Sequence, residues 1–169
     1  FTQIGTGSLD LGFMTIPYIV IIAAVISLIM YVVYNKTILG KNMFAIGGNP
    51  QAAVVSGINV AVTLVIIYVI AGALYGVGGI LEAARTGGAT NNYGNMYELD
   101  AIAASVVGGV SITGGIGTVP GIIAGVLIFT VINYGLTFVG MGPYWQLIIK
   151  GLIIVVAVAF DVRKSMARK

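Results

Sequence analysis

The chain is organised as long apolar runs separated by short polar breaks. Four of these runs have close to 20 residues with almost no charge inside them. A helix of about 20 residues is about 30 Å long, which matches the hydrocarbon core of a bilayer. No run shows the sustained period-two alternation of a membrane β-barrel strand. The pattern therefore predicts an all-α, polytopic transmembrane helix bundle, with spans at Ile16–Tyr34, Val60–Leu81, Val119–Val139 and Tyr144–Phe160.

A fifth apolar run, Leu99–Thr113, is shorter, at about 15 residues or roughly 22 Å as a helix. Basic residues follow the first long run (Lys36 and Lys41) and the last one (within 163–169), and such clusters mark the cytoplasmic side. Two cytoplasmic clusters require an even number of crossings between them, so the short run must also cross. About five crossings result, with residues 1–12 outside. The alternative is a re-entrant half-helix, which leaves one basic cluster outside.

Composition supports a membrane location and excludes several classes of site. Hydrophobic residues make up 59% of the chain and charged residues 8%, and the mean hydropathy is +1.07, whereas soluble domains have roughly 25% charged residues. With no His and no Cys, the chain has no disulfide and no imidazole or thiolate metal site. We predict no catalytic residue, metal or cofactor. Because the first residue is Phe1, we expect residues 1–169 to be one transmembrane domain of a longer protein.

The motifs of the chain indicate neither an ATP-binding site nor an intramembrane protease. The chain has no phosphate-binding G-x-x-x-x-G-K-[ST] sequence. The glycine-rich "GGVSITGGIGTVPG" lacks that lysine, so we interpret it as a tight turn between two crossings. Asp10, Asp100 and Asp161 fall at the ends of spans, so they form no facing aspartyl pair. The chain is predicted not to be an enzyme and not to bind nucleic acid.

One short polar stretch, "GGNPQAAVVSGI", predicts a helix that is too short to cross a membrane. Asn49 is a good N-cap, Pro50 suits the first helical position, and Gly57 can take the left-handed conformation that ends a helix. The helix Pro50–Ser56 would lie on the cytoplasmic side. We expect Val54 to face the membrane or the bundle. The outward face would be small and uncharged, and would consist of Gln51, Ala52, Val55 and Ser56. An ordinary connector and a knob for a cytosolic partner both remain open.

Three stretches of the sequence resemble a known transporter family. They are "FAIGGNPQAAVVSGINV", "YELDAIAASVVGGVSITGGIGTVPG" and "FTVINYGLTFVGMGPYWQLIIKGLIIVVAVAFD". They resemble the permease subunits of bacterial ribose/galactose-type sugar importers of the ATP-binding-cassette class. "GGNPQAA", "TNNYGNMYELDAIAA" and "GPYWQ" match the galactose/methyl-galactoside branch. The resemblance implies the C-terminal half of a multi-pass inner-membrane permease. Its expected partners are a second permease copy, two cytosolic ATPase subunits and an external sugar-binding protein.

The resemblance also implies a role for the short helix. In this family a short cytoplasmic coupling helix fits a cleft on the ATPase. The matching residues here are Gly47, Gly48, Asn49, Pro50, Gln51, Ala52, Ala53, Ser56 and Gly57. The expected cargo is a hexose such as galactose or methyl-galactoside. A ribose or nucleoside importer stays open, as does half of a secondary sugar transporter or channel that has no ATPase.

A few polar residues lie within the predicted spans. Lys150 is inside the last span, with Gln146 four residues before it on the same face. Its ammonium group either snorkels to the outer interface or pairs with Glu98 or Asp100 at the start of the short span. Asn133 and Thr137 form a polar stripe on the preceding span. They could contact sugar or make helix–helix hydrogen bonds.

Overall fold

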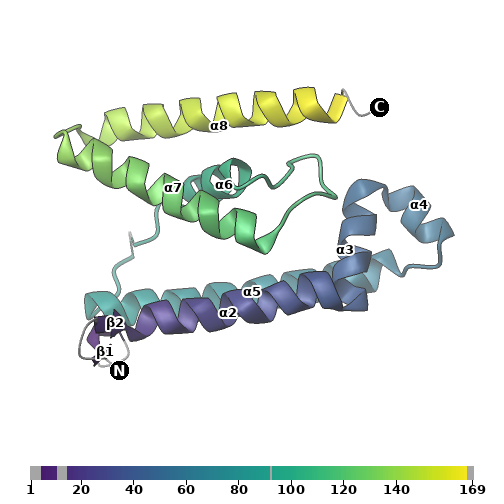
Figure 1. The fold of residues 1–169 in the computed structure, drawn as a ribbon, viewed down its shortest axis with the longest axis horizontal. Coiled ribbons are helices and arrows are strands. Elements are labelled where there is room, and N and C mark those ends of the chain that lie inside the picture. The colour runs from purple at the N-terminus through teal and green to yellow at the C-terminus, as the bar shows by residue number, and fades with distance from the viewer. Residues whose placement is uncertain (1–4, 11–14, 92, 167–169) are drawn as a thin grey trace. The chain divides into compact units, whose positions relative to one another are not determined.

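The structure is a computed structural model that describes residues 5–10, 15–91 and 93–166. Two predicted features fall partly outside these residues: the basic residues Arg168 and Lys169, and part of the outer segment 1–12. The elements, in chain order, are β1 (Ser8–Asp10), β2 (Thr15–Pro17), α2 (Tyr18–Lys36), α3 (Ile38–Gly48), α4 (Pro50–Val55), α5 (Val60–Thr86), α6 (Tyr97–Val107), α7 (Val119–Phe138) and α8 (Pro143–Met166) (Figure 1).

The predicted all-α class and the four long spans are confirmed. Helices α2, α5, α7 and α8 are each long and apolar enough to cross a membrane. Strand in the described part of the chain is confined to a small antiparallel hairpin, in which Leu9 of β1 lies opposite Ile16 of β2. The hairpin was not predicted, because three-residue strands carry no readable alternation. The chain therefore has the architecture of a helical polytopic membrane protein.

The chain forms two compact units, and the first comprises residues 1–43 and 56–93. Its long helix α2 has no buried residue, and α5 buries only Thr63 and Ala84. The N-terminus of α5 is capped by Asn59, whose Oδ1 accepts a hydrogen bond from the backbone N of Val62 at 3.1 Å. Apolar helices that expose most of their side chains are stable against hydrocarbon or another apolar surface, which agrees with the predicted membrane location.

Helix α3 was not predicted. It begins at a sharp corner after α2. Thr37 Oγ1 donates to the Val33 carbonyl at 2.6 Å and accepts from the Gly40 backbone N at 3.2 Å, so it serves the end of one helix and the start of the next. Gly40 is buried there, and a Cβ on it would collide with the Tyr34 carbonyl.

The second unit comprises residues 44–55 and 94–169 and contains α6, α7 and α8. Helix α6 packs against both α7 and α8 (Figure 1). Its buried Ala103 and Ala104 form a small core with Phe129 of α7, and Ile153 and Ile154 of α8 pack against that core. The core side chains on α6 are small, so the helices approach closely.

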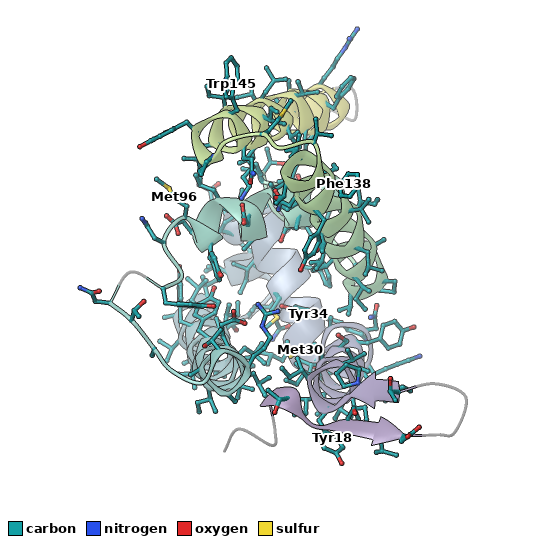
Figure 2. The ribbon with its side chains drawn as sticks, turned by 90° about the vertical axis from the view of Figure 1, so that its left-hand side faces the viewer. Tyr18, Met30, Tyr34, Met96, Phe138 and Trp145 are labelled. Atoms are coloured by element: carbon teal, nitrogen blue, oxygen red, sulfur yellow. The ribbon has the colours of Figure 1, made fainter. Side chains whose placement is uncertain are left out.

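Glycines let α6 and α7 meet backbone to backbone. A Cβ on Gly125 of α7 would collide with the Ala104 carbonyl and would lie 2.6 Å from the Gly108 backbone N. A Cβ on Gly121 would collide with the Gly108 carbonyl. The start of α8 exposes an aromatic residue instead: Trp145 stands on the side of α8 away from α7 and is 64% exposed (Figure 2), as expected for a ring at a membrane interface.

The predicted short span is helical over only part of its length. The apolar run was expected to be helix as far as Thr113, but α6 has 11 residues and ends at Val107, which gives a length of about 16 Å. The helix stops because Gly108 and Gly109 follow, and Gly109 takes a left-handed φ of +84°. Residues 108–118, here called the glycine loop, then lead into α7. The apolar run continues past Val107, so the hydropathy of the sequence did not mark the end of the helix.

Candidate functional site

The local signals for the short helix α4 are confirmed. Asn49 Oδ1 accepts a hydrogen bond from the backbone N of Ala52 at 3.0 Å, and Pro50 is the first helical residue. Gly57 has a φ of +82°. The helix ends at Val55, one residue before the predicted end. A helix of six residues has almost no stability by itself, so the cap and the contacts of its N-terminal side hold it in place.

The exposed surface of α4 includes Val54. Val54 was expected to face the membrane or the bundle; it is 59% exposed, so it does not pack in the bundle, whereas Ala53 is 3% exposed. Val55 is 89% exposed at the end of the helix. Gln51, Ala52 and Ser56 are exposed as predicted. The buried side is thus limited to one methyl group. No charged residue occurs from position 42 to 81, so the exposed surface of α4 is uncharged.

Gly47 and Gly48, immediately before the cap, lie against the glycine loop. A Cβ on Gly47 would be 2.6 Å from the Gly115 backbone N, and one on Gly115 would be 2.8 Å from the Gly48 Cα. A Cβ on Gly114 would collide with the Gly47 carbonyl. Gly114 and Gly115 have φ values of +93° and +72°. Backbone therefore packs on backbone here, and the start of α4 rests on the loop that joins α6 to α7.

The same loop is fastened to α8 by Asp161, a contact that sequence reasoning missed. Asp161 Oδ2 accepts from Ser111 Oγ at 2.8 Å and from the Ile112 backbone N at 3.0 Å. Ser111 is 7% exposed. Asp161 had been noted only as a residue at the end of a span. The available signal was a single acid at the end of an apolar helix together with a loop rich in Ser and Thr, but nothing in the sequence says that the two meet.

Lys150 and Asp100 lie together between α8 and α6. Lys150 Nζ donates a hydrogen bond to Asp100 Oδ2 at 3.0 Å. It also lies 2.7 Å from Asp100 Oδ1, as an ion-pair contact without hydrogen-bond geometry. The two side chains are 15% and 30% exposed. Nζ also lies 5.9 Å from the centre of the Phe129 ring. Of the two acids considered from sequence, Asp100 makes the contact and Glu98 is exposed.

These two contacts define how α6 and the loop run along α8. Asp100 of α6 contacts Lys150, and Ser111 of the loop contacts Asp161. From the first contact to the second, the chain advances by 11 residues on α8 and by 11 residues from α6 into the loop. Eleven helical residues on α8 extend about 16 Å. The chain from α6 to the loop therefore advances in the same direction as α8, towards the end that carries Arg163. This direction favours the crossing over the re-entrant alternative, and five crossings stay a prediction.

Cysteine labelling tests the crossing directly, because the chain has no native Cys. Thr113 is exposed in the glycine loop. A cysteine there should react only with reagents applied to the side on which a cysteine at Arg163 reacts. Labelling from the opposite side would establish the re-entrant arrangement.

The polar stripe on α7 makes hydrogen bonds near the turn to α8. Thr137 Oγ1 donates to the Asn133 carbonyl at 2.9 Å. Gln146 Nε2 donates to the Met141 carbonyl at 3.0 Å and lies 3.4 Å from Thr137 Oγ1. Asn133 Oδ1 is buried and has no hydrogen-bond partner among the described residues. Thr137 and Gln146 thus make hydrogen bonds at the turn between α7 and α8, and a role in a transport path stays a prediction for Asn133, Thr137 and Gln146.

The chain is similar to known permease proteins. Over its full length the chain is 60% identical to the galactose/methyl galactoside import permease protein of Haemophilus influenzae and 56% identical to that of Escherichia coli, and it covers 50% of each. It is 42% identical over 153 residues to the ribose import permease protein of Bacillus subtilis, covering 90% of this chain and 48% of that one. The chain thus spans about half the length of these relatives.

No solved structure matches it. Residues 2–158 match the model of the family described as branched-chain amino acid transport system / permease component, and the chain belongs to that family.

Proposed function

We propose that this chain is part of the permease subunit of an ATP-binding-cassette importer and that it helps to form the membrane path for a hexose such as galactose or methyl galactoside. The observation that carries the proposal is α4, a capped helix with an exposed, uncharged surface whose start is seated on the glycine loop. The full-length similarity to two permeases named for galactose/methyl galactoside import supports the choice of cargo.

The exposed surface of α4 suits docking into a groove of a cytosolic ATPase. Burying a charge in a protein groove without a partner costs free energy, so a docking surface benefits from having none. Ala52 and Ser56 are small, and the protruding Val55 offers an apolar side chain that a pocket can enclose. In the proposed importer, a separate ATPase subunit drives transport through this contact.

The assembly that follows has three kinds of component. Two copies of the permease form the path, two ATPase subunits bind at the cytoplasmic side, and a sugar-loaded binding protein docks outside. The permease itself lies in the inner membrane of a bacterium and is not an enzyme. The basic cytoplasmic ends of α2 and α8, marked by Lys36 and Arg163, support this orientation.

Two other functions make different predictions. A secondary transporter or channel half needs no ATPase and predicts sugar flux that an ion gradient drives or that runs downhill. A ribose or nucleoside importer keeps the ATPase but changes the cargo. The ribose import permease of B. subtilis matches at lower identity, 42% against 60%, which favours the hexose.

Reconstitution separates these functions. The permease containing this chain would be purified with its ATPase and incorporated into vesicles with the binding protein. The proposal predicts ATP-dependent uptake of galactose or methyl galactoside, and ATP hydrolysis that rises with the sugar-loaded binding protein. Uptake of sugar without ATP, or uptake of ribose in preference to galactose, would replace it with the corresponding alternative.

A further inference from the structure

The glycine loop has two sides, and each side contacts a different part of the second unit. On one side Ser111 and Ile112 bind Asp161 near the end of α8. On the other side Gly114 and Gly115 touch Gly47 and Gly48, which lead into α4. The proposed function uses α4 but gives no role to Asp161.

The hydrogen bonds at Asp161 fix the loop firmly. An ionised carboxylate only accepts hydrogen bonds, so the single hydroxyl proton of Ser111 points to Asp161, and Thr113 Oγ1 must donate to Ser111 Oγ across their 2.8 Å separation. Backbone bonds then close the loop on itself: Ser111 N donates to the Ile116 carbonyl at 3.0 Å and Gly114 N to the Ser111 carbonyl at 3.2 Å. Hydrogen bonds to a charged acceptor are stronger than neutral ones.

The contact on the other side transmits the position of the loop to α4. Glycines at 47, 48, 114 and 115 leave no side chain between the two backbones. Asn49 follows directly and caps α4, and its backbone N also donates to the Ala45 carbonyl at 3.0 Å. A shift of the loop therefore displaces the first residues of α4, since close-packed backbone has little room to give.

We propose that Asp161 is a positioning residue for the docking helix: through Ser111, Ile112 and the glycine loop it holds the start of α4 in register with α8, so that a movement imposed on α4 reaches α6 and α8. The inference rests on the proposed docking function of α4. It assigns to the loop the role of the mechanical link between the ATPase contact and the membrane helices of the second unit.

The test uses the assembled importer, with permease, ATPase and binding protein in lipid nanodiscs, and compares Asp161→Ala with Asp161→Asn. The alanine variant removes both acceptors, whereas asparagine keeps one acceptor oxygen and the size. We expect Asp161→Ala to lower the stimulation of ATP hydrolysis by sugar-loaded binding protein about tenfold, and Asp161→Asn to recover it to within about threefold of the parent. Basal hydrolysis and the amount of ATPase bound should stay within about twofold, because the residues on the exposed face of α4 are unchanged.

A matched control and a second variant complete the set. Arg163→Gln removes a charge two residues away on an exposed position of α8 and should behave like the parent. Ser111→Ala removes one of the two donors and leaves the Ile112 backbone N in place, so stimulation should fall about threefold. Should Asp161→Ala fail to insert, Ser111→Ala still decides the question: normal stimulation in Ser111→Ala would overturn the inference.

A distance measurement reads positioning directly. Spin labels would be attached at Gln51 on α4 and Val155 on α8, both exposed positions of the second unit in a chain without native Cys. The distance distribution should be narrow in the parent and in Arg163→Gln, and broad in Asp161→Ala. A narrow distribution in Asp161→Ala, or a normal stimulation of hydrolysis whatever the distribution, would overturn the inference.

Ala52→Glu distinguishes a failure of this inference from a failure of the proposed function. If Ala52→Glu abolishes coupling while Asp161→Ala does not, α4 is the docking helix and Asp161 has no positioning role. If Ala52→Glu leaves attachment and stimulation normal, the docking function itself is wrong.

Discussion

Two helices that are too short to cross a membrane, α4 and α6, differ in what covers them. Helix α6 buries Ala103, Ala104 and Val106 against its own chain, and its Asp100 is bound to Lys150. Helix α4 buries only Ala53 and leaves its other side chains exposed. A short helix enclosed by its neighbours is part of the bundle. One that is fixed at its start but bare elsewhere has a surface that another chain can cover.

The packing of α6 against α7 depends most on the glycine at position 125. Replacing Gly125 by Val would push a side chain into the Ala104 carbonyl and the Gly108 backbone. Overpacking of this kind costs about 1–3 kcal/mol, and backbone contacts leave less room for relief. We expect a large loss of monodisperse protein and a lower thermal midpoint in detergent. Gly135→Val, on the same helix with nothing within 4 Å of its Cβ position, is the control. Equal behaviour of the two variants would mean that α6 and α7 do not meet as described.

The ion pair that ties α6 to α8 gives the next largest effect. Lys150→Met keeps the length of the side chain and leaves Asp100 without its partner, which should cost about 1–3 kcal/mol of stability. Adding Asp100→Asn should restore part of the loss, because the uncompensated acid is removed. Adding Glu98→Gln instead should restore nothing, since Glu98 is exposed. A double-mutant cycle on thermal stability measures both couplings. Strictly additive effects of Lys150→Met and Asp100→Asn would show that the pair has no energetic role.

The smallest effect is expected at the end of α4. Gly57 has a φ of +82° and nothing within 4 Å of its Cβ position, so a substitution acts through the backbone alone. Gly57→Ala should cost about 1 kcal/mol, whereas Gly57→Asn should cost less because Asn tolerates the left-handed region. Sugar-stimulated ATP hydrolysis should decrease a few-fold in the alanine variant and less in the asparagine variant. A loss of equal size in both would point to a lost side-chain contact instead of backbone strain.

The part of the site that sequence could predict was the local part. The start of α4 at Pro50 and the turn at Gly57 follow from residues within one helical turn, and the structure has both. The end of α6 was predicted too late, because apolar residues continue past Val107 although the backbone turns at Gly109. Local residue preferences cannot report contacts between segments 50 or more positions apart.

Two such long-range contacts shape the candidate site. The bond from Ser111 to Asp161 joins residues 50 positions apart. The approach of Gly47 to Gly115 depends on how α3 and the glycine loop are placed in the fold. Each of these residues has an ordinary local interpretation, a hydroxyl in a loop, an acid at a helix end or a glycine at a turn. The roles that we propose for them therefore became visible only with the structure.

The central claim, that α4 is the surface to which the ATPase docks, is tested most directly by placing a charge on it. Ala52→Glu adds a carboxylate to the exposed face, and Ala45→Glu makes the same change at an exposed position of α3, one turn before the cap. In vesicles with correctly inserted protein, we predict that Ala52→Glu lowers both sugar uptake and sugar-stimulated ATP hydrolysis at least about tenfold, which corresponds to about 1.4 kcal/mol. Ala45→Glu should stay within about twofold of the parent in both measurements. Normal uptake and normal hydrolysis with Ala52→Glu would contradict the account and make α4 an ordinary connector.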